Sequence, residues 1–535
     1  MTEPITYLTT TIPYVNARPH LGHALEFVEA DVLARHYRRR GHQVRFQTGT
    51  DDNSLKNVLA AQAEGVATQD LVDRNAAAFE ALRGSLALSF DEFVRTSRDP
   101  RHRAGVERLW QQCAESGDLY RKHYGGRYCV GCEQFYLDTE LVDGRCPEHG
   151  TEPQLVAEEN WFFRLSRYAG QLHDLITSGR LRIEPATRRN EVLAFIAGGL
   201  ADFSISRSRA RARDWGIPVP DDPDQVIYVW WDALGNYLTA LDYATDGEPY
   251  RHWWVRSDRR LHLLGKGVTR FHAVYWPAML LSAGQPLPTD IYVHGYLTVA
   301  GERISKSGGT SVDPVALVER YGVDAVRWWL LREVPRAGDA DFTVERLAAR
   351  ADTELANGLG NLVNRTVSMV HRYRGGVVSA AANGGVVSAA ANGGVVPAAP
   401  TGGVASAGSD GDAGRELDRA LERVPALVED SLADFDFRAA TGAVWDVVEA
   451  ANRFVNDRRP WQLAKAEGAA GEAAAAASAG LDAVLHRLVT TGRAIAAELA
   501  PFLPVAASRI EAQLTPAADG TLPPAAPLFP RLADR

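Results

Sequence analysis

The sequence predicts an α/β protein in which a nucleotide-binding fold is split by an insertion and followed by an all-helical region. Residues 7–11 and 44–46 alternate as in β-strands, and residues 24–40 between them have a helical period that ends at Gly41. A second αβ-like stretch runs from about residue 225 to residue 334. Beyond residue 342 the apolar residues recur at helical spacing only, so a helical region should close the chain.

Length, charge and cysteine content limit the class of protein. A chain of 535 residues is long enough for several domains, and its net charge of −9 excludes a surface that is basic overall, although a local basic groove for nucleic acid stays open. Three of the four cysteines lie in one stretch, which favours a reducing compartment, and Cys113 should be a buried, idle thiol. With no signal peptide and no long apolar run, the sequence predicts a cytoplasmic protein without a membrane partner.

The predicted boundaries follow these composition changes. A nine-residue repeat, GGVVSAAAN, opens a Gly/Ala-rich segment that cannot bury enough apolar surface to offset its chain entropy, so we expect disorder there. The Ala-rich residues 466–480 predict a loop extension or a frayed helix. The expected divisions are 1–120 (first half of the nucleotide-binding fold), 121–224 (insertion), 225–341 (second half), 342–515 (helical domain, with 375–414 disordered) and 516–535 (tail).

The insertion contains the spacing of a zinc site. Cys129 and Cys132 form one knuckle, and Cys146 and His149 form a second. Three thiolates and an imidazole in two tight turns suit tetrahedral Zn²⁺, whereas the alternative is a set of unrelated thiols in a loop. Four protein ligands leave no open coordination position, so one structural, non-catalytic ion per chain is expected.

Two further motifs are weak separately and stronger together. The segment HLGH, residues 20–23, places two imidazoles at a predicted helix N-terminus, where the dipole favours a phosphate; alone it could be a helix cap. The segment ERISKSGGT, from residue 302, could be any solvated loop. A helix end after the first strand and a cationic loop after the second half can hold a triphosphate from both sides, which predicts nucleotidyl transfer.

Long segments of the chain resemble the methionyl-tRNA synthetases of class I, which carry HIGH and KMSKS signatures. The matching stretches are TTTIPYVNARPHLGHALEFVEADVLARH, QTGTDD, YCVGCEQFY with CPEHGTEP, EENWFFRLSRY, DWGIPVP, QVIYVWWDAL with NYL, LLGKG with RFHAVYWPAML, VHGYLTVAGERISKS and NGLGNLVNRTVSMV. The resemblance implies a Rossmann-type catalytic domain, a zinc-knuckle insertion and a C-terminal all-α anticodon-binding bundle.

The resemblance also implies a reaction and its partners. Methionine would attack the α-phosphate of ATP, and the adenylate would pass its acyl group to the 3′-terminal ribose of tRNA(Met). The implied partners are ATP with Mg²⁺, L-methionine and tRNA(Met), with no DNA and no membrane. After about residue 514 only a Pro/Ala-rich tail follows, so the expected state is a monomer without an appended dimerisation module.

The family pattern assigns candidate residues to each subsite. The implied catalytic residues are His20, His23 and Lys306, which would bind charge rather than shuttle protons. The remaining assignments are Gly22, Gly265, Lys266, Arg303 and Ser305 for ATP, together with the catalytic residues; Ile12, Tyr14, Asp51, Trp230, Tyr237, Val268 and His272 for methionine; and Asn361, Arg365 and Trp461 for the anticodon.

Plainer interpretations exist for several of these residues. Trp230, Tyr237 and His272 could be ordinary core residues, and Trp461 could be a packing residue after the helix-breaking Pro460. The motif matches favour the binding roles. The arginine run SISRSRARARDWG could touch RNA phosphate, but for Arg209, Arg211 and Arg213 we expect a solvated charge run.

The chain departs from the family pattern in three places. The usual GTDEHG is GTDDNS, which keeps Asp51 but replaces a histidine by Asn53 and a glycine by Ser54. The usual GKD is GKG, so Gly267 lacks the carboxylate expected to bind the ATP ribose. Loss of such a hydrogen bond should weaken ATP binding by ~1.5–3 kcal/mol. The change of KMSKS to RISKS looks mild because Arg303 and Lys306 keep both charges.

These departures leave alternatives to the methionine:tRNA ligase. One is a divergent paralogue that activates methionine or an analogue, as a drug-insensitive duplicate or with acyl transfer to a small molecule. The other is a tRNA-binding protein without catalysis, although such a protein would be expected to have lost His20, His23 or Lys306, and these residues are present.

Overall fold

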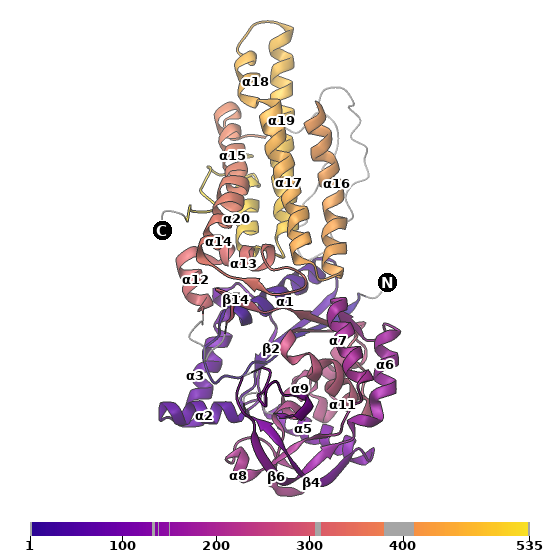
Figure 1. Ribbon diagram of the computed structural model, residues 1–535. Coiled ribbons are helices and arrows are strands. Elements are labelled where there is room, and N and C mark those ends of the chain that lie inside the picture. Colours follow the sequence, from indigo (N-terminus) through magenta and orange to yellow (C-terminus); the bar gives the residue numbers. More distant parts are fainter. Residues whose placement is uncertain are drawn as a thin grey trace.

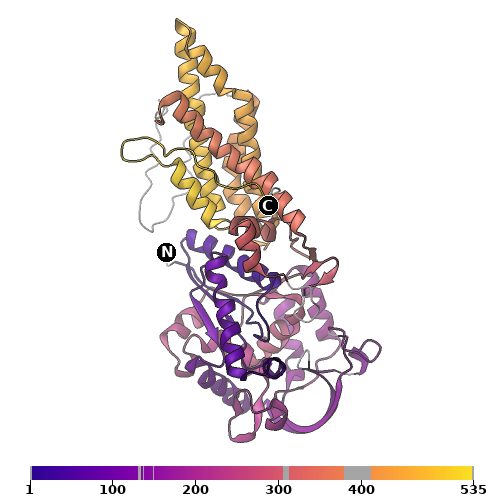
Figure 2. The same ribbon diagram turned by 90° about the vertical axis from the view of Figure 1, so that its left-hand side faces the viewer.

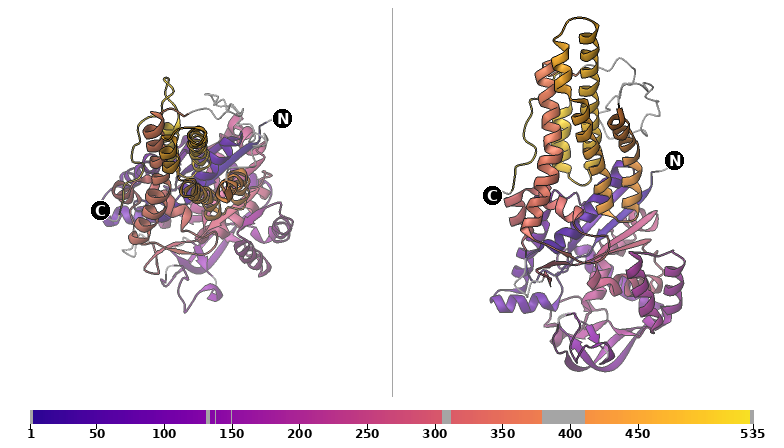
Figure 3. Two further views of the ribbon diagram at one scale, coloured as in Figure 1. Left: turned by 90° about the horizontal axis from the view of Figure 1, so that it is seen from above. Right: turned by 45° about the horizontal axis from the view of Figure 1, so that its top comes forward.

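The computed structural model describes residues 3–130, 134–136, 138–148, 150–304, 312–378 and 411–532. The chain forms an elongated molecule, with an α/β part at one end and a bundle of long helices at the other (Figure 1). A view turned by 90° shows the same division along the long axis (Figure 2). Seen from above, several bundle helices are viewed nearly end-on, so they run along that axis (Figure 3).

A parallel sheet forms the centre of the α/β part. Strand β1 pairs with β12 in parallel register, Thr6 opposite Arg259 and Thr10 opposite Leu263, so strands from the two halves lie side by side. The predicted split nucleotide-binding fold is therefore confirmed. The strand order is β3-β2-β1-β12-β13-β7, with bounds Glu92–Arg95, Gln43–Thr50, Ile5–Thr10, Arg259–Gly265, Asp290–His294 and Arg182–Glu184.

Helix α1, Leu21–Arg39, follows β1 and is buried along most of its length. The predicted helix over residues 24–40 is thus observed, starting one turn earlier because the two histidines cap it. Gly41, at φ +80°, then turns the chain into β2. The other helices of the α/β part are α2 (Leu55–Glu64), α3 (Thr68–Glu80), α4 (Leu82–Ser85), α5 (Pro100–Glu115), α9 (Val229–Thr239), α10 (Glu248–Tyr250), α11 (Trp276–Ser282), α12 (Pro314–Tyr321) and α13 (Val323–Arg332).

The inserted region forms its own sheets but also joins the central one. Its strand β7 pairs with β13 at the edge of the parallel sheet, Ile183 opposite Ile291, a contribution that the sequence did not indicate. Its other elements are an antiparallel sheet of β4 (Leu119–Cys129), β5 (Gln134–Tyr136), β6 (Gln154–Phe163) and β8 (Phe203–Ser204), a second sheet of β9 (Ser206–Ser208), β10 (Pro218–Val219) and β11 (Asp222–Ile227), and helices α6 (Ala169–Thr177), α7 (Ala186–Ala197) and α8 (Arg209–Ala212).

The helical region begins after a small sheet of β14 (Leu297–Val299), β15 (Glu302–Arg303) and β16 (Ala340–Asp341). Its elements are α14 (Val344–Arg350), a π-helical segment (Ala351–Gly360), α15 (Asn361–Arg374), α16 (Gly411–Ala433), α17 (Phe437–Arg458), α18 (Pro460–Glu467), α19 (Glu472–Leu499) and α20 (Pro504–Leu514).

Three details of the helical region differ from the sequence prediction or fall outside it. Residues 379–410 of the expected disordered segment lie outside the described residues, whereas residues 411–414 are helical and begin α16. The Ala-rich segment is mostly the first turns of α19, because alanine favours a helix wherever a longer helix can include it. The C-terminal tail packs back on the bundle, with Leu522, Leu528 and Leu532 buried.

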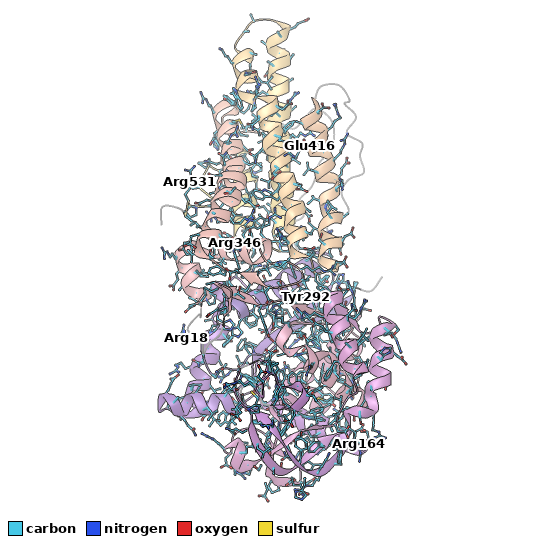
Figure 4. The ribbon with its side chains drawn as sticks, viewed as in Figure 1. Arg18, Arg164, Tyr292, Arg346, Glu416 and Arg531 are labelled. Atoms are coloured by element: carbon cyan, nitrogen blue, oxygen red, sulfur yellow. The ribbon has the colours of Figure 1, made fainter. Side chains whose placement is uncertain are left out.

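Side chains of both parts meet where the bundle joins the sheet, near Tyr292 (Figure 4). The ring of Tyr292 stacks on Phe435, with centroids 4.8 Å apart. The buried guanidinium of Arg327 on α13 donates to the carbonyl oxygens of Leu86 and Phe502 and pairs with Asp31 of α1 at 2.9 Å. Within the described residues, no helix is both long and apolar enough to cross a membrane.

Candidate active site

The N-terminus of α1 is formed by the HLGH segment, whose two histidines cap the helix. The backbone N–H of Gly22 donates to Nδ1 of His20 over 3.1 Å, and the backbone N–H of His20 donates to Nδ1 of His23 over 3.0 Å. The two rings stack with centroids 3.7 Å apart. A neutral imidazole whose Nδ1 accepts a hydrogen bond carries its proton on Nε2. Both rings therefore have an Nε2–H donor at a helix end that favours anions.

The helix start also contacts the residue that follows the RISKS loop. The backbone N–H of Leu21 donates to the carbonyl oxygen of Val312 over 2.9 Å. Ser305 and Lys306 lie outside the described residues, and of Arg303 only the backbone, in β15, is described. Val312, the first described residue after that gap, therefore brings the chain beyond the RISKS loop to the start of α1.

Glu26, which the sequence analysis did not single out, connects the ends of three strands. One carboxylate oxygen accepts from the backbone N–H of Thr11 over 2.7 Å and from its hydroxyl. The other oxygen accepts from the backbone N–H of Gly265 over 3.1 Å and from Nε2 of His294 over 3.0 Å. A carboxylate at an inward position two turns into α1 was the signal that could have identified it, since a buried carboxylate requires several donors.

The Glu26 side chain determines the charge state of this cluster. Burial lowers the pKa of His294, but this is outweighed by the hydrogen bond to Glu26 and by the charge that Glu29 carries above its own pKa, so that the pKa of His294 is raised to about 9. Burial raises the pKa of Glu29 to about 8. At neutral pH the histidine is therefore protonated and paired with Glu26, while Glu29 holds its proton.

The predicted methionine residues come together around α9 and the turn after β12. The hydroxyl of Tyr237 lies 2.8 Å from Nε2 of His272, and Nδ1 of His272 lies 3.0 Å from the carbonyl oxygen of Val268. Because a carbonyl can only accept, Nδ1 carries the proton and Nε2 accepts from the tyrosine. Burial lowers the pKa of His272 to about 4, so this hydrogen-bonded pair is uncharged at neutral pH.

Trp230 lies beside this pair, with its ring centroid 6.4 Å from that of His272. Its ring stacks on Phe271 with centroids 3.8 Å apart, and Tyr14 meets it edge-on at 6.2 Å. Ile12 is half-buried in the segment that leads from β1 to Tyr14. Phe271 was not predicted, because no spacing rule separates it from the other aromatic residues of its segment.

His262, a second unpredicted residue, supports the pocket from inside the sheet. Its Nδ1 lies 2.6 Å from the hydroxyl of Thr9, its Nε2 accepts from the indole N–H of Trp276 over 3.2 Å, and its ring packs on Tyr237 at 4.3 Å. Burial keeps its pKa well below the usual value. The sequence placed this segment in the second αβ-like stretch, but only the fold shows that its inward histidine packs against Tyr237.

The GTDDNS loop, at the end of β2, holds Asp51. A parallel bridge joins Asp51 to Tyr14, and the backbone N–H of Asp51 donates to Pro13 over 3.0 Å. Ser54, which replaces a glycine of the family pattern, has φ −71° and caps α2 by accepting from the N–H of Lys56 over 3.1 Å. No left-handed backbone is needed at this position, so the loop accommodates serine.

The GKG segment ends β12. Gly265 donates to Glu26 as described, and the ammonium group of Lys266 pairs with both carboxylate oxygens of Asp339 at 2.8 Å. Lys266 therefore has an ionic partner in the structure, which the sequence did not indicate. Gly267 is the middle residue of the short helical turn Lys266–Val268 and brings no carboxylate to it.

Cys129 and Cys146 lie together in the insertion, whereas Cys132 and His149 are outside the described residues. Both described cysteines are buried and form a small cluster with Tyr136, whose hydroxyl lies 3.6 Å from the sulfur of Cys146. The described residues contain no group of three potential metal ligands, as expected when two of the four predicted ligands are not among them. Cys113 is buried elsewhere, and burial raises the pKa of its thiol to about 12.

The predicted anticodon residues lie in the helical bundle. Asn361 begins α15 and is exposed, and Arg365 follows one turn later on the same helix. The guanidinium of Arg365 lies 6.0 Å from the ring centroid of Trp461 on α18, and this ring is 42% exposed. The exposed indole contradicts the interpretation of Trp461 as a packing residue.

One expectation for the arginine run is wrong. Arg209 and Arg213 are exposed as expected, but Arg211 packs over the ring of Tyr128 at 3.8 Å and pairs with Glu158 at 2.8 Å. Charge alternation in the sequence cannot distinguish a solvated arginine from one that stacks on an aromatic ring.

Comparison with known proteins identifies the class to which this fold and this site belong. The family model described as tRNA synthetases class I (M) matches residues 6–155 and 139–367, more than half of the chain. The protein is therefore a class I tRNA synthetase. Among curated proteins, the methionine--tRNA ligase of Mycobacterium bovis is 42% identical over 87% of this chain and 85% of its own length. That of Brucella suis is 37% identical over 99% of this chain and 98% of its own length.

Solved structures agree with this classification. The methionyl-tRNA synthetase of Mycobacterium tuberculosis in complex with methionyl-adenylate superimposes with a TM-score of 0.87 at 38% identity, covering 99% of this chain and 100% of that chain. The chain belongs to the methionyl-tRNA synthetase family.

Proposed function

We propose that this protein ligates L-methionine to tRNA(Met) in an ATP-dependent reaction through a methionyl-adenylate. The observation that carries the proposal is the position of two unlike sites at the ends of the same parallel strands. One is a histidine-capped helix end suited to phosphate, and the other is an uncharged aromatic pocket suited to a thioether. The switch between β1 and β12 is where such sheets bind nucleotides.

In the first step, a carboxylate oxygen of methionine forms a bond to the α-phosphorus of ATP, and the bond to pyrophosphate breaks. His20 and His23 would donate Nε2–H groups to phosphate oxygens as charge builds on them. Lys306 would neutralise the pyrophosphate leaving group. The other residues that would bind ATP are Gly22, Gly265, Lys266, Arg303 and Ser305. Mg²⁺ bound with ATP would screen the phosphate charge.

For the amino acid, Asp51 would bind the ammonium group. Trp230, Tyr237, Val268 and His272 would surround the side chain, with Ile12 and Tyr14 at the edge nearest to β1. A neutral His272 supports this assignment, because an apolar thioether placed against a charged imidazole could not replace the water that solvates that charge.

We propose one structural Zn²⁺ held by Cys129, Cys132, Cys146 and His149. Two buried sulfurs in one small cluster fit this group. When bound, the ion would hold the two knuckles together and so stabilise the inserted sheet. Zinc analysis of the purified protein should give one ion per chain, and Cys146→Ser or a chelator should lower the melting temperature. Cys113→Ser is the matched control, and unchanged stability under a chelator would contradict the assignment.

The second step transfers the methionyl group to the 3′-terminal ribose of tRNA(Met), which releases AMP. Asn361, Arg365 and Trp461 would bind the anticodon, with the exposed indole as a stacking surface. We propose the domain division given by the sequence, a monomeric state and a cytoplasmic location as working assignments that accompany this function.

Amino-acid-dependent ATP–pyrophosphate exchange tests the proposal. Screened against all twenty amino acids, the protein should exchange with methionine and should charge tRNA(Met). Gly267→Asp restores the family carboxylate and should lower the KM for ATP about tenfold or more, from a hydrogen bond worth ~1.5–3 kcal/mol. Exchange with no amino acid would contradict the proposal, and exchange with a different amino acid would contradict the substrate.

A further inference from the structure

Asn53, which stands where the family pattern has histidine, takes part in a buried hydrogen-bonded chain beside the methionine pocket. Its side-chain amide donates to a carboxylate oxygen of Asp232 over 2.7 Å. Asn53 is 9% exposed and Asp232 is 1% exposed, so solvent scarcely competes for this bond. The departure from the family pattern therefore keeps a side-chain N–H donor at this position.

Asp232 is held from its other side as well. Its second carboxylate oxygen bonds to Nε2 of His102 on α5, and Nδ1 of His102 lies 2.8 Å from the hydroxyl of Thr239. His102 is completely buried. The carboxylate of Asp232 thus has a fixed orientation, with one oxygen for α5 and one for the Asn53 loop.

Asn53, held by Asp232, also binds Asp51 and so helps to fix the orientation of its carboxylate. The backbone N–H of Asn53 donates to a carboxylate oxygen of Asp51 over 3.2 Å. The side chain of Asn57 donates to the carbonyl oxygen of Asp51 over 3.1 Å and to that of Asp52 over 2.9 Å, which holds the rest of the loop. The carboxylate proposed to bind the ammonium group is therefore oriented by the residue that Asp232 anchors.

Asp232 also lies on α9, the helix that carries Trp230 and Tyr237. The Asn53–Asp232 hydrogen bond thus joins the loop that would hold one end of the amino acid to the helix that would hold the other end. It connects elements that are 179 residues apart in the sequence.

We propose that Asn53 and Asp232 act as a pair of positioning residues that sets the separation between the ammonium site and the thioether pocket, and so selects the length of the amino acid side chain. This inference rests on the proposed methionine activation and extends it to how methionine is distinguished from its shorter and longer analogues. Neither residue contacts the reacting atoms; both act through Asp51 and α9.

The test is steady-state ATP–pyrophosphate exchange with L-methionine, L-homocysteine and L-ethionine, which differ by one carbon in the side chain. Asn53→Ala should raise the KM for methionine about tenfold, equivalent to ~1.4 kcal/mol, and leave the KM for ATP within about twofold. The preference for methionine over ethionine should fall by a similar factor, because the two ends of the site are no longer held at one distance.

Asn53→His, which restores the family residue and an N–H donor, should return both values toward those of the unmodified protein. Asp232→Ala should change the same constants at least as much, because it also removes the bond to His102, and the double variant should be no worse than Asp232→Ala, since the Asn53–Asp232 hydrogen bond is already lost there. Ser54→Gly is the matched control in the same loop, and it should leave the kinetic constants unchanged.

Melting temperatures and active-site titration separate this role from a purely structural one. If Asn53→Ala lowers only the active fraction or the melting temperature and the methionine-to-ethionine ratio stays constant, the inference is overturned while the proposed function stands. Additive effects in the double variant would also overturn it. If the unmodified protein shows no methionine-dependent exchange, the proposed function fails, and the inference fails with it.

Discussion

The two ends of the candidate site are built in different ways. At the phosphate end, the donors are the Nε2–H groups of two histidines at a helix N-terminus, whose Nδ1 atoms accept from the backbone N–H groups of Gly22 and His20. At the amino-acid end, ring stacking and side-chain hydrogen bonds hold buried groups in one arrangement, as for Trp230 on Phe271 and Tyr237 on His272. The first end offers donors to a charge that changes during reaction, and the second offers a fixed shape.

This difference predicts which kinetic constant, kcat or KM, each end of the candidate site controls. Interactions that strengthen only as charge develops raise kcat, whereas interactions that are equal in the ground and transition states lower KM. We therefore expect substitutions at the helix end to lower kcat and substitutions in the pocket to raise the KM for methionine. The following predictions test this separation.

The largest effect is expected at the helix end. His23→Ala removes an Nε2–H donor and should lower kcat for methionine-dependent pyrophosphate exchange by about 10²–10³-fold, as for loss of one preorganised donor to a developing charge. The KM for methionine should change little. A variant that kept kcat but raised the KM for methionine would show that His23 serves the pocket instead.

A smaller effect is expected in the pocket. Tyr237→Phe leaves the buried Nε2 of His272 without its tyrosine donor, at a cost of ~1–3 kcal/mol. The KM for methionine should rise about tenfold, with kcat nearly unchanged. Phe271→Leu, which removes the ring that stacks on Trp230, should likewise raise the KM for methionine. A fall in kcat without a change in KM would contradict the separation.

The smallest effect on activity and the clearest pH dependence are expected at His294 and Glu29, the titratable residues near Glu26. The folded state raises the pKa of His294 from 6.5 to about 9, so its contribution to stability is complete below pH 6.5 and is lost as the pH rises to about 9. Glu29, whose pKa is raised from 4.5 to about 8, also makes the folded state less stable as the pH rises.

Urea unfolding of the protein and of His294→Gln measures this contribution. The difference in free energy of unfolding should be larger at pH 6.5 than at pH 9.5, because the ion pair with Glu26 exists only when the histidine is protonated. Glu29→Gln separates the second group. Equal differences at both pH values would contradict the protonated state of His294.

Much of the fold could be predicted from the sequence because the signals are local. The helical period after the first strand, the strand alternation at residues 44–46 and the histidines before α1 each follow from neighbouring residues. The joining of β7 to the central sheet could not be predicted, since a short strand pairs wherever an open edge lies near it.

The residues of the candidate site also fall into those that the sequence could identify and those that it could not. Sequence motifs identified His20, His23, Trp230, Tyr237 and His272, which the structure brings to the expected elements. They did not single out Glu26 or His262. The inward position of Glu26 on α1 was a local signal, but neighbouring residues do not reveal what a buried polar residue binds. Its partners, such as His294 and Trp276, are distant in the chain or lie on another element.

The sequence by itself determined the class of protein, the order of its elements and the residue types proposed to bind phosphate and thioether. Only the tertiary structure decided how those groups are charged and held: a neutral His272, a protonated His294, and an Asn53 that takes a donor role beside Asp232. The physical reason is that burial and hydrogen bonding set protonation and orientation, and both depend on which distant segments pack together.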